Sequence, residues 1–368
     1  MSQTSFATSK QVGWDEPVPD PKIDTYAPMR AATANWPRDS ALIVMDARGL
    51  GYRSFYTRDL NAEGGSSTAV LHGMLHTIRA ACEAGNTRRF VLVWDGNVKY
   101  KRRVYPGYKD RHDAAKTPEQ EKESREREDA MRLATDWFRH ARVPTAYHPD
   151  LEADDLAGIV GESWLRMAAK VCKDQQRVIY LTDDKDYYQL IRKDRAYVWR
   201  GVRAELVDHA SFRGRFGFEP ERYVDYKALV GEPATGDNIP GVHSVGDVTA
   251  AKMVATHGDL EAIIAFCTAQ AARGKKAKKV EQAVHRHADL ARVSYRLSRI
   301  MLRAEDAAEH KMDVDQLRAG VVLVLKAAVQ VPRTMPVGAI DTLRQRLGFA
   351  AFDSIRWREA CGFVLSIA

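Results

Sequence analysis

Three short apolar segments, each followed directly by aspartate, constrain the fold of this chain more than any other feature. They are residues 41–45, 90–94 and 178–182, and the acidic residues after them are Asp46, then Asp95, then Asp183, Asp184 and Asp186. Apolar runs of this length are typical of strands buried on both faces of a sheet. Helical patterns at residues 68–84 and 156–171 lie between them. This alternation predicts an α/β fold with a mostly parallel central sheet and flanking helices.

The aspartates after the three strands are expected at one edge of the sheet, because parallel strands end on the same side, where ligands bind in such folds. A further group, Glu152 with Asp154 and Asp155, stands at a predicted helix start. That group alone is equally well explained as helix capping. Crowding around Asp184 and Asp186 is harder to explain structurally, because like charges cost stability unless a cation compensates them.

The chemistry of these side chains favours a particular class of metal ion. Oxygen ligands without histidine or cysteine favour Mg²⁺, with Mn²⁺ as a substitute, over zinc. Four widely spaced cysteines contain no CxxC pair, which argues against structural zinc and against a secreted disulfide framework. Two magnesium ions can hold an attacking water and a leaving oxygen in line across a phosphate. The net charge of +7 fits an anionic partner but is common in other proteins.

The composition divides the chain into four parts. Residues 1–38 are rich in proline and predict an extended or disordered lead-in. Residues 39–218 hold the α/β domain, and residues 219–307 a smaller helical domain. Residues 308–368 form a C-terminal extension of unknown role, with a helix expected at 314–329. The chain begins without a secretory pattern and has no apolar run long enough to span a membrane, so we expect a cytoplasmic protein without a membrane partner.

The order and spacing of these motifs resemble the flap endonuclease and 5′-3′ exonuclease family, which includes the nuclease domain of bacterial DNA polymerase I and phage relatives. The resemblance covers residues 41–303. Its most specific parts are residues 152–155, residues 184–190 and the Gly-Asp-Asn-Ile-Pro-Gly-Val segment at 236–242. It implies a nuclease core like that of PIN domains, a helical arch, and a DNA-binding helical domain with a helix-hairpin-helix-type motif.

The resemblance also implies a set of metal ligands. They are Asp46, Asp95, Glu152, Asp154, Asp155, Asp184 and Asp186, with Asp237 from the helical domain. Asp46 and Asp184 are the central catalytic carboxylates among them. Asp183 stands where the family has glycine and is not counted as a ligand. Glu232 replaces an aspartate, with two extra residues before Asp237, and is the candidate ligand of the second metal ion.

The segment 101–111 interleaves basic and aromatic side chains, a composition that neutralises phosphates and stacks on unpaired bases. A solvated loop is the alternative. The resemblance makes it part of a helical gateway and arch around 97–150, with Lys109 at the scissile phosphate. The other residues implied there are Arg102, Arg103, Tyr105 and Tyr108 on the DNA, and Arg111 as the catalytic arginine. The family's arginine usually lies one residue later, where this chain has His112.

Two other segments complete the implied DNA-binding surface. The charged pattern at 117–142 would form the arch helix, or simply a solvated helix face. Residues 241–252 resemble a hairpin that grips duplex phosphates, or else a helix-turn-helix packing element. The hairpin residues implied are Gly241, Gly246 and Lys252 on DNA, and the carbonyls of Val242 and Val245 on K⁺. Ser244 departs from the family's glycine.

We therefore expect a monomeric, structure-specific 5′ nuclease of a bacterial or phage-infected cell, acting in DNA replication or repair. Its substrate would be DNA with a free 5′ end, flap or nick, or an RNA primer on DNA, and its cofactors two Mg²⁺ ions. Two alternatives stay open. One is a DNA-binding protein that keeps the fold but cleaves poorly, suggested by Glu232 and the altered hairpin. The other is a related nuclease that acts mainly on RNA.

Overall fold

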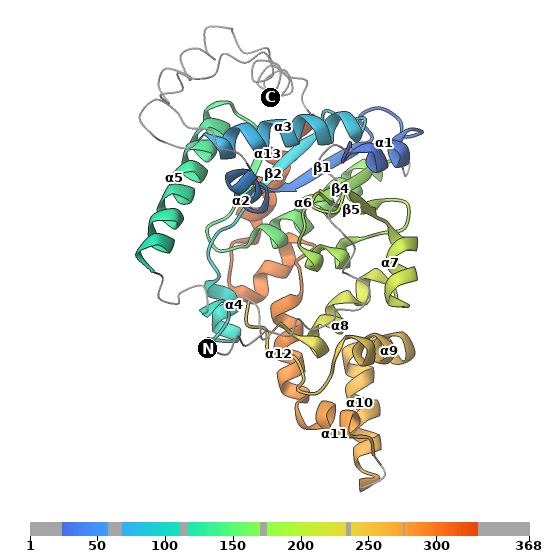
Figure 1. Cartoon of the computed structure of the whole chain (residues 1–368). Coiled ribbons are helices and arrows are strands. Elements are labelled where there is room, and N and C mark those ends of the chain that lie inside the picture. Colours follow the sequence, from blue (N-terminus) through green and yellow to red (C-terminus); the bar gives the residue numbers. More distant parts are fainter. Residues whose placement is uncertain are drawn as a thin grey trace, which may run out of the picture.

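The computed structural model describes residues 24–57, 68–110, 117–169, 175–232, 237–274 and 277–329. The described residues contain a six-stranded sheet of order β3-β2-β1-β4-β5-β6, parallel except for β6 (Figure 1). The strands are β1 (Ala41–Asp46), β2 (Phe90–Trp94), β3 (Thr145–Tyr147), β4 (Arg177–Leu181), β5 (Ala196–Arg200) and β6 (Glu205–Val207). The three predicted strands are β2, β1 and β4, which lie side by side in the sheet, so the predicted α/β fold is confirmed.

Alternate residues of the central strands enter two separate apolar cores, as the two-residue period of a strand requires. In β1, Leu42 and Val44 face one core, and Ile43 and Met45 face the other. The first face is covered by α6 (Ala153–Ala169). The second is covered by α2 (Ala47–Thr57), α3 (Ala69–Ala84) and α5 (Pro118–His140). Both faces are buried, which explains why the strands are apolar throughout.

The segment before β1 corrects the predicted disordered lead-in. Residues 24–38 contain α1 (Ala27–Thr33), which packs against α3. Met29 is fully buried, the Thr33 hydroxyl donates to the Ala84 carbonyl at 2.6 Å, and Tyr26 stacks on Trp199 with ring centroids 5.3 Å apart. Pro28 lies in the first turn of α1, where a missing backbone N–H costs no intrahelical hydrogen bond, so this proline is compatible with a helix start. Residues 1–23 lie outside the described residues.

Met29→Ala is expected to lower the free energy of unfolding by about 2–4 kcal/mol, because it removes a fully buried side chain and leaves a cavity. Urea denaturation of the whole chain measures this loss. Arg30→Ala, on the exposed side of the same helix, is the matched control and should cost about 0.5 kcal/mol or less. Equal, small losses in both variants would show that α1 does not join the core.

The helical domain packs directly on the functional edge of the sheet. Its helices are α8 (Tyr223–Val230), α9 (Asp247–His257), α10 (Leu260–Ala271), α11 (Lys279–Arg286) and α12 (Ala288–Ser298), and α7 (His209–Phe216) precedes it at the end of the α/β domain. Helix α8 contacts the 3-10 helix η2 (Lys185–Leu190) that follows β4, and α12 contacts α4 (Lys99–Val104). Figure 1 shows α9, α10 and α11 at the far end of this domain from the sheet.

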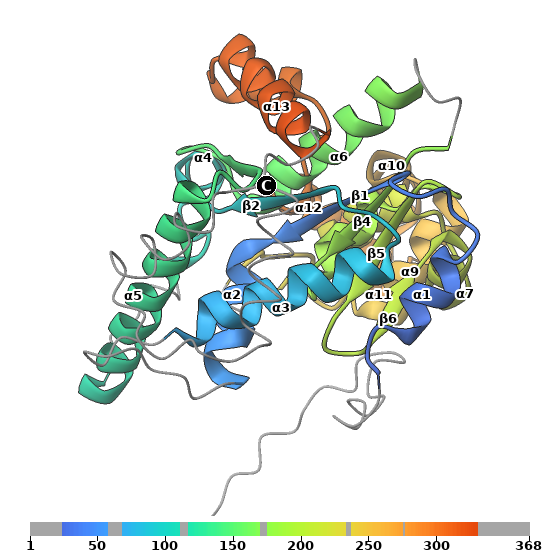
Figure 2. The same cartoon turned by 90° about the horizontal axis from the view of Figure 1, so that it is seen from above.

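The predicted helix 314–329 is present with those bounds, as α13 (Val314–Val329). Leu317, Val321 and Leu325 on α13 are buried, and the helix contacts α6, β2 and β3. Figure 2 shows α13 beside α6, on the other side of the sheet from α3. This part of the predicted extension therefore belongs to the nuclease core, and residues 330–368 lie outside the described residues. No helix among the described residues is long and apolar enough to cross a membrane.

Candidate active site

The carboxylates at the ends of β2, β1 and β4 lie on three adjacent strands. Asp46 ends β1, and Asp95 directly follows β2, which pairs with β1 in parallel. On the other side, the Thr182 hydroxyl at the end of β4 is 3.5 Å from the Asp46 carboxylate. The topology thus brings together at one edge the three groups that the sequence predicts there.

Backbone amides hold each of these carboxylates in place. Asp46 accepts a hydrogen bond from the Gly49 amide at 3.0 Å, and a Cβ at Gly49 would stand 2.8 Å from the carboxylate. Asp95 accepts from the Ala153 amide at 2.9 Å, which joins β2 to the start of α6. Asp184 accepts from the Asp186 amide at 2.9 Å and caps η2. The side chains are therefore positioned before any ligand binds.

Two of these carboxylates have raised pKa values, although Asp46 is only half-buried and Asp184 is partly exposed. Burial, followed by the charge of Asp95, raises the pKa of Asp46 to about 6. Burial, followed by the charge of Asp186, raises the pKa of Asp184 to about 7. Within the described residues, neither carboxylate forms an ion pair with a lysine or arginine. The negative charges of Asp46 and Asp184 are therefore crowded by neighbouring carboxylates, and a bound cation would relieve this repulsion.

A second part of the edge is neutralised by lysines of the gateway segment. The Lys101 ammonium, on α4, lies 2.7 Å from Glu152 and 3.5 Å from Asp154, and its side chain is 2% exposed. Lys109 forms a close ion pair with Glu152 and lies 3.7 Å from the Asp237 carboxylate. Although burial opposes it, these two ammonium groups hold the pKa of Glu152 at about 2. Lys109 has a positive φ of 55°, which is uncommon for a residue with a side chain.

The gateway turn corrects two predicted DNA contacts. Tyr108 is buried, and its hydroxyl donates to Glu152 at 3.1 Å, so its ring is not available to stack on a base. The Arg102 guanidinium donates to the carbonyls of Tyr108 and Lys109 at 3.0 and 3.1 Å, so it braces the turn. Asn238, from the segment 236–242, also holds this turn, because its side chain donates to the Gly107 carbonyl at 2.8 Å.

The other predicted gateway residues have different positions. Tyr105 is half-buried and packs against a small apolar cluster that contains Ile239. Arg103 is exposed, and its guanidinium donates to the His310 carbonyl at 3.3 Å. Arg111 lies outside the described residues. Helix α5 begins with a capping box at Thr117, and its charged first half is mostly exposed while its second half enters the core, so both interpretations of this helix stay open.

Asp155 is a further correction, because both of its oxygens are occupied by protein donors. It accepts from the Met301 amide at 2.9 Å and from the Tyr100 hydroxyl, and it is fully buried. It therefore fastens α6 to the segment before η5 (Ala304–His310) and does not act as a direct metal ligand in this arrangement. Asp154, one residue earlier, faces Lys101 and the carboxylate edge.

The helical domain contributes a lysine between two of the predicted ligands. The Lys227 ammonium, on α8, lies 2.9 Å from Asp186 and 2.5 Å from Glu232. Glu232 is held in position by a backbone hydrogen bond of 2.7 Å from its amide to the Ile239 carbonyl. The structure thus places Glu232 beside Asp186, although two extra residues separate it from Asp237.

Tyr187 is another functional candidate that the sequence argument missed. Its hydroxyl is buried and has no hydrogen-bond partner among the described residues. Burial raises its pKa well above the usual value, and so do the charges of Asp46, Asp154, Asp184 and Asp95. The signal available was its place directly after the Asp184–Asp186 motif. Lys101 had only its place in the segment 101–111 as a signal, and Lys227 had none, because buried lysines are rare.

The residues of this edge fit divalent metal ions in their chemistry. All the donors are carboxylates, two of them have raised pKa values and no ion pair among the described residues, and the Tyr187 hydroxyl, which has no hydrogen-bond partner there, is suited to a bound water. As they stand, no three histidine, cysteine or acidic side chains among the described residues converge closely enough to enclose an ion. Lysine ammonium groups hold several of the carboxylates instead.

Metal ions are expected to stabilise the protein more at about pH 8 than at about pH 5. As the pH falls through about 7 and 6, Asp184 and Asp46 become protonated, so an ion must displace their protons. The measurement is the rise in Tm on adding Mn²⁺ at each pH. A rise that did not shrink on acidification would separate these two carboxylates from metal binding.

The predicted hairpin is present before α9, but one of its contacts is internal. The Gly241 amide donates to the Ser294 hydroxyl at 2.9 Å inside the domain, so it cannot grip a phosphate. Ser244 adopts a φ of 70°, the conformation for which glycine is favoured. Gly246 and Lys252 are exposed at the start of α9 and along it. The Val242 carbonyl accepts from the Val245 amide at 3.1 Å, and potassium binding there stays a prediction.

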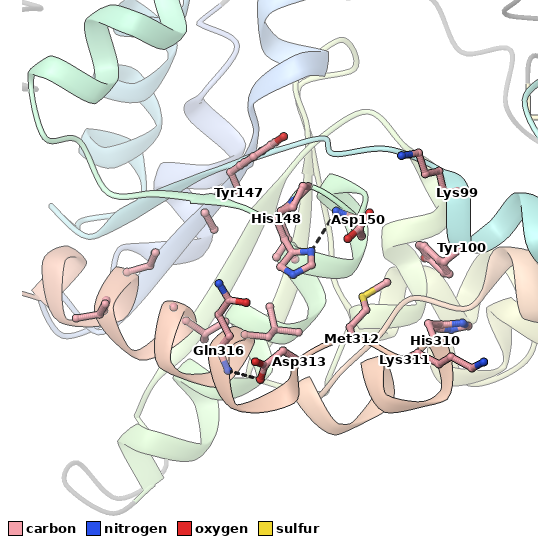
Figure 3. Close-up of a pocket in the computed structure, with 18 of the residues that line it drawn as sticks. Lys99, Tyr100, Tyr147, His148, Asp150, His310, Lys311, Met312, Asp313 and Gln316 are labelled. Atoms are coloured by element: carbon pink, nitrogen blue, oxygen red, sulfur yellow. Dashed lines mark hydrogen bonds between the residues drawn. The ribbon is translucent and has the colours of Figure 1, made fainter.

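A separate cavity lies on the other side of Tyr100 from the carboxylates. It has a volume of about 670 Å³ and lies between the residues after β3 and the turn from η5 to α13 (Figure 3). Tyr100 separates it from the carboxylates, because its hydroxyl reaches Asp155 while its ring lies 4.5 Å, between centroids, from His310. Lys99 and Lys311 contribute positive charge to the lining.

Two family models together match most of the chain. One is described as a 5′-3′ exonuclease N-terminal resolvase-like domain and matches residues 41–217. The other is described as a 5′-3′ exonuclease C-terminal SAM fold and matches residues 218–320. The border between them lies one residue from the border that the composition predicts.

Curated relatives agree with these models. The chain is 28% identical over 284 residues to a thermostable DNA polymerase I of Thermus thermophilus, covering 76% of this chain and 31% of the polymerase. It is 28% identical over 225 residues to a 5′-3′ exonuclease of Aquifex aeolicus, covering 61% of this chain and 72% of that protein. The chain thus spans about a third of the polymerase that it matches.

Solved structures share the fold. A flap endonuclease of bacteriophage T5, in a complex with DNA and metal ions, superposes with a TM-score of 0.65 at 18% identity. The match covers 79% of this chain and all of that one. A 5′-exonuclease of the same phage with bound zinc gives a TM-score of 0.64 over 78% of this chain and 99% of that one, also at 18% identity.

Proposed function

The chain belongs to the 5′-3′ exonuclease family, and from this premise we propose that it hydrolyses DNA phosphodiester bonds near a free 5′ end. One observation carries the proposal. Lys109 of the gateway segment lies against Glu152 of the nuclease core and Asp237 of the helical domain, and the residue after Glu152 donates its amide to Asp95 at the carboxylate edge. A phosphate at this place meets a cation on one side and carboxylates that bind metal on the other.

The carboxylates would hold two Mg²⁺ ions, for which Mn²⁺ can substitute. The proposed ligands are Asp46, Asp95, Glu152, Asp154, Asp184 and Asp186 from the core, and Glu232 and Asp237 from the helical domain. When bound, the ions supply an acidified water as nucleophile and neutralise charge on the phosphate. Lys109 offsets the negative charge that develops in the transition state. The buried Tyr187 hydroxyl orients water at the carboxylate edge.

The proposed substrate is a duplex with a free 5′ end, a flap or a nick. The exposed start of α9 offers backbone amides and Lys252 to duplex phosphates, which are contacts that do not read sequence. The 5′ strand would enter beside the gateway segment, where Arg103 is exposed. The T5 structure superposed above is described as bound to DNA and metal ions, which supports the same mode here.

The direct test is incubation of the whole chain with 5′-flap, nicked and blunt duplexes in Mg²⁺, with an EDTA control. We expect metal-dependent release of short 5′ products. The second candidate, a DNA-binding protein that cleaves poorly, is favoured by Lys227 between Asp186 and Glu232 and by the occupied oxygens of Asp155. Binding of all three duplexes without cleavage, in either Mg²⁺ or Mn²⁺, would select that candidate.

Lys252→Ala is expected to weaken duplex binding and to lower the slope of log K against log salt by about one unit, because it removes one phosphate contact. The cleavage rate at saturating enzyme should change little. Fluorescence anisotropy at several salt concentrations measures the slope. The matched control is Lys326→Ala, which changes an exposed lysine on α13. An identical slope in both variants would remove Lys252 from the DNA-binding surface.

A further inference from the structure

We propose that Lys227 is a built-in counter-ion that holds the place of the second metal ion, so that this ion binds only by displacing the lysine from Asp186 and Glu232. The inference rests on the proposed function for the role of the carboxylates. It adds an order of binding: an ion at Asp46 and Asp184 breaks no ion pair of the described residues, and an ion at Asp186 and Glu232 breaks two.

Apart from the carboxylates paired with Lys101 and Lys109, the carboxylate edge has two halves that differ in their partners. In the half at the ends of β1 and β4, Asp46 and Asp184 have no lysine or arginine ion-pair partner within the described part of the chain. In the half against the helical domain, the Lys227 ammonium is within 2.9 Å of both Asp186 and Glu232. The side chain of Lys227 is only 5% exposed, so water does little to screen these ion pairs.

The position of Lys227 follows from the packing of two domains. It lies on α8, which contacts η2, and η2 carries Asp186. Glu232 comes two residues after α8 ends and is tied to Ile239 by its backbone. Helix α8 and the two residues after it therefore supply both the lysine and one of the carboxylates that the lysine neutralises. The core domain supplies the other.

Electrostatics predicts what this arrangement does to metal affinity. A buried ion pair loses stability when one partner is removed, because the other charge is left uncompensated. A divalent cation at Asp186 and Glu232 would restore that compensation, but only if the ammonium moves away, since two cations at one place repel each other. The second ion therefore binds against the cost of breaking two ion pairs, and the first ion does not.

The test is a titration of the full chain with Mn²⁺ in the absence of DNA, with free Mn²⁺ followed by electron paramagnetic resonance. The wild type is expected to bind one ion tightly and a second more weakly. Lys227→Met keeps most of the length of the side chain and removes its charge. It should tighten the weaker ion by about tenfold or more while changing the tighter one by less than about twofold. Lys326→Met, on the exposed side of α13, should leave both unchanged.

A second variant keeps the result interpretable if the single variant is unstable without metal. Lys227→Met with Glu232→Gln removes one positive and one negative charge together, so it should fold and bind the weaker ion no better than the wild type. If Lys227→Met unfolds, Mn²⁺ should refold it, as circular dichroism would show. An unchanged or weakened second ion in Lys227→Met, or failure of Mn²⁺ to refold it, would overturn the inference.

The outcome is separable from that of the proposed function. Cleavage of a 5′ flap by the wild type tests the nuclease function and does not involve the variant. If the wild type cleaves but Lys227→Met gains no affinity, only the counter-ion role fails. If the wild type does not cleave but Lys227→Met gains affinity, the nuclease function fails and the counter-ion role stands.

Discussion

Asp184→Asn is expected to slow metal-dependent cleavage by about a thousandfold or more, because it neutralises a central carboxylate that would hold the ions. Asp184 is placed by its hydrogen bond from the Asp186 amide, at 2.9 Å, and asparagine can keep that contact. The fold should therefore persist. Binding of DNA without metal should persist as well and should even tighten, because one negative charge is removed from a site that faces phosphates.

The matched control is Asp183→Asn, one residue earlier. Asp183 points to different partners, since it accepts from the Val202 amide at 3.0 Å and lies 3.5 Å from the Arg53 guanidinium. Its substitution should lower the stability slightly and leave the cleavage rate within a few-fold of the wild type. Single-turnover rates in Mg²⁺ and anisotropy with DNA measure both effects. Equally severe losses of rate would show that the two aspartates have been assigned to the wrong positions.

Lys109→Ala is expected to slow cleavage by about a hundredfold while changing DNA affinity only a few-fold. One phosphate contact among many contributes little to binding, but this ammonium lies where negative charge develops. Glu152 would keep its ion pair with Lys101 at 2.7 Å, so the gateway side of the edge should stay folded. The experiment compares single-turnover rates with dissociation constants measured in Ca²⁺.

Arg103→Ala separates the two possible roles of the gateway segment. Arg103 is exposed on the same short helix as Lys101, so its loss should weaken binding more than rate. If Lys109→Ala lost binding and rate in equal measure, Lys109 would belong to the surface that holds the DNA backbone. If it lost neither, the proposed place of the scissile phosphate would be wrong.

The sequence by itself determined the sheet and its acidic edge. An apolar run of five residues, typical of a strand buried on both faces, is a local pattern that can be found in the sequence. Because parallel strands end on the same side of a sheet, Asp46, Asp95 and Asp184 could be predicted to lie at one edge. The helix 314–329 was likewise predictable from local periodicity. In residues 24–38, a single buried methionine gives too little hydrophobic periodicity to predict a helix. Helix α1 is recognised only in the structure, where it contacts α3.

Only the tertiary structure decided which side chains face the ions and which face the protein. Asp155 accepts from Met301, 146 residues away in sequence, and Gly241 donates to Ser294, 53 residues away. Tyr108 and Lys101 turn inward onto the acidic start of α6, and Lys227 reaches Asp186 from the other domain. The spacing of a motif shows only which residues are close along the sequence. The compensation of a buried charge depends on neighbours in space, and the packing of the two domains sets these.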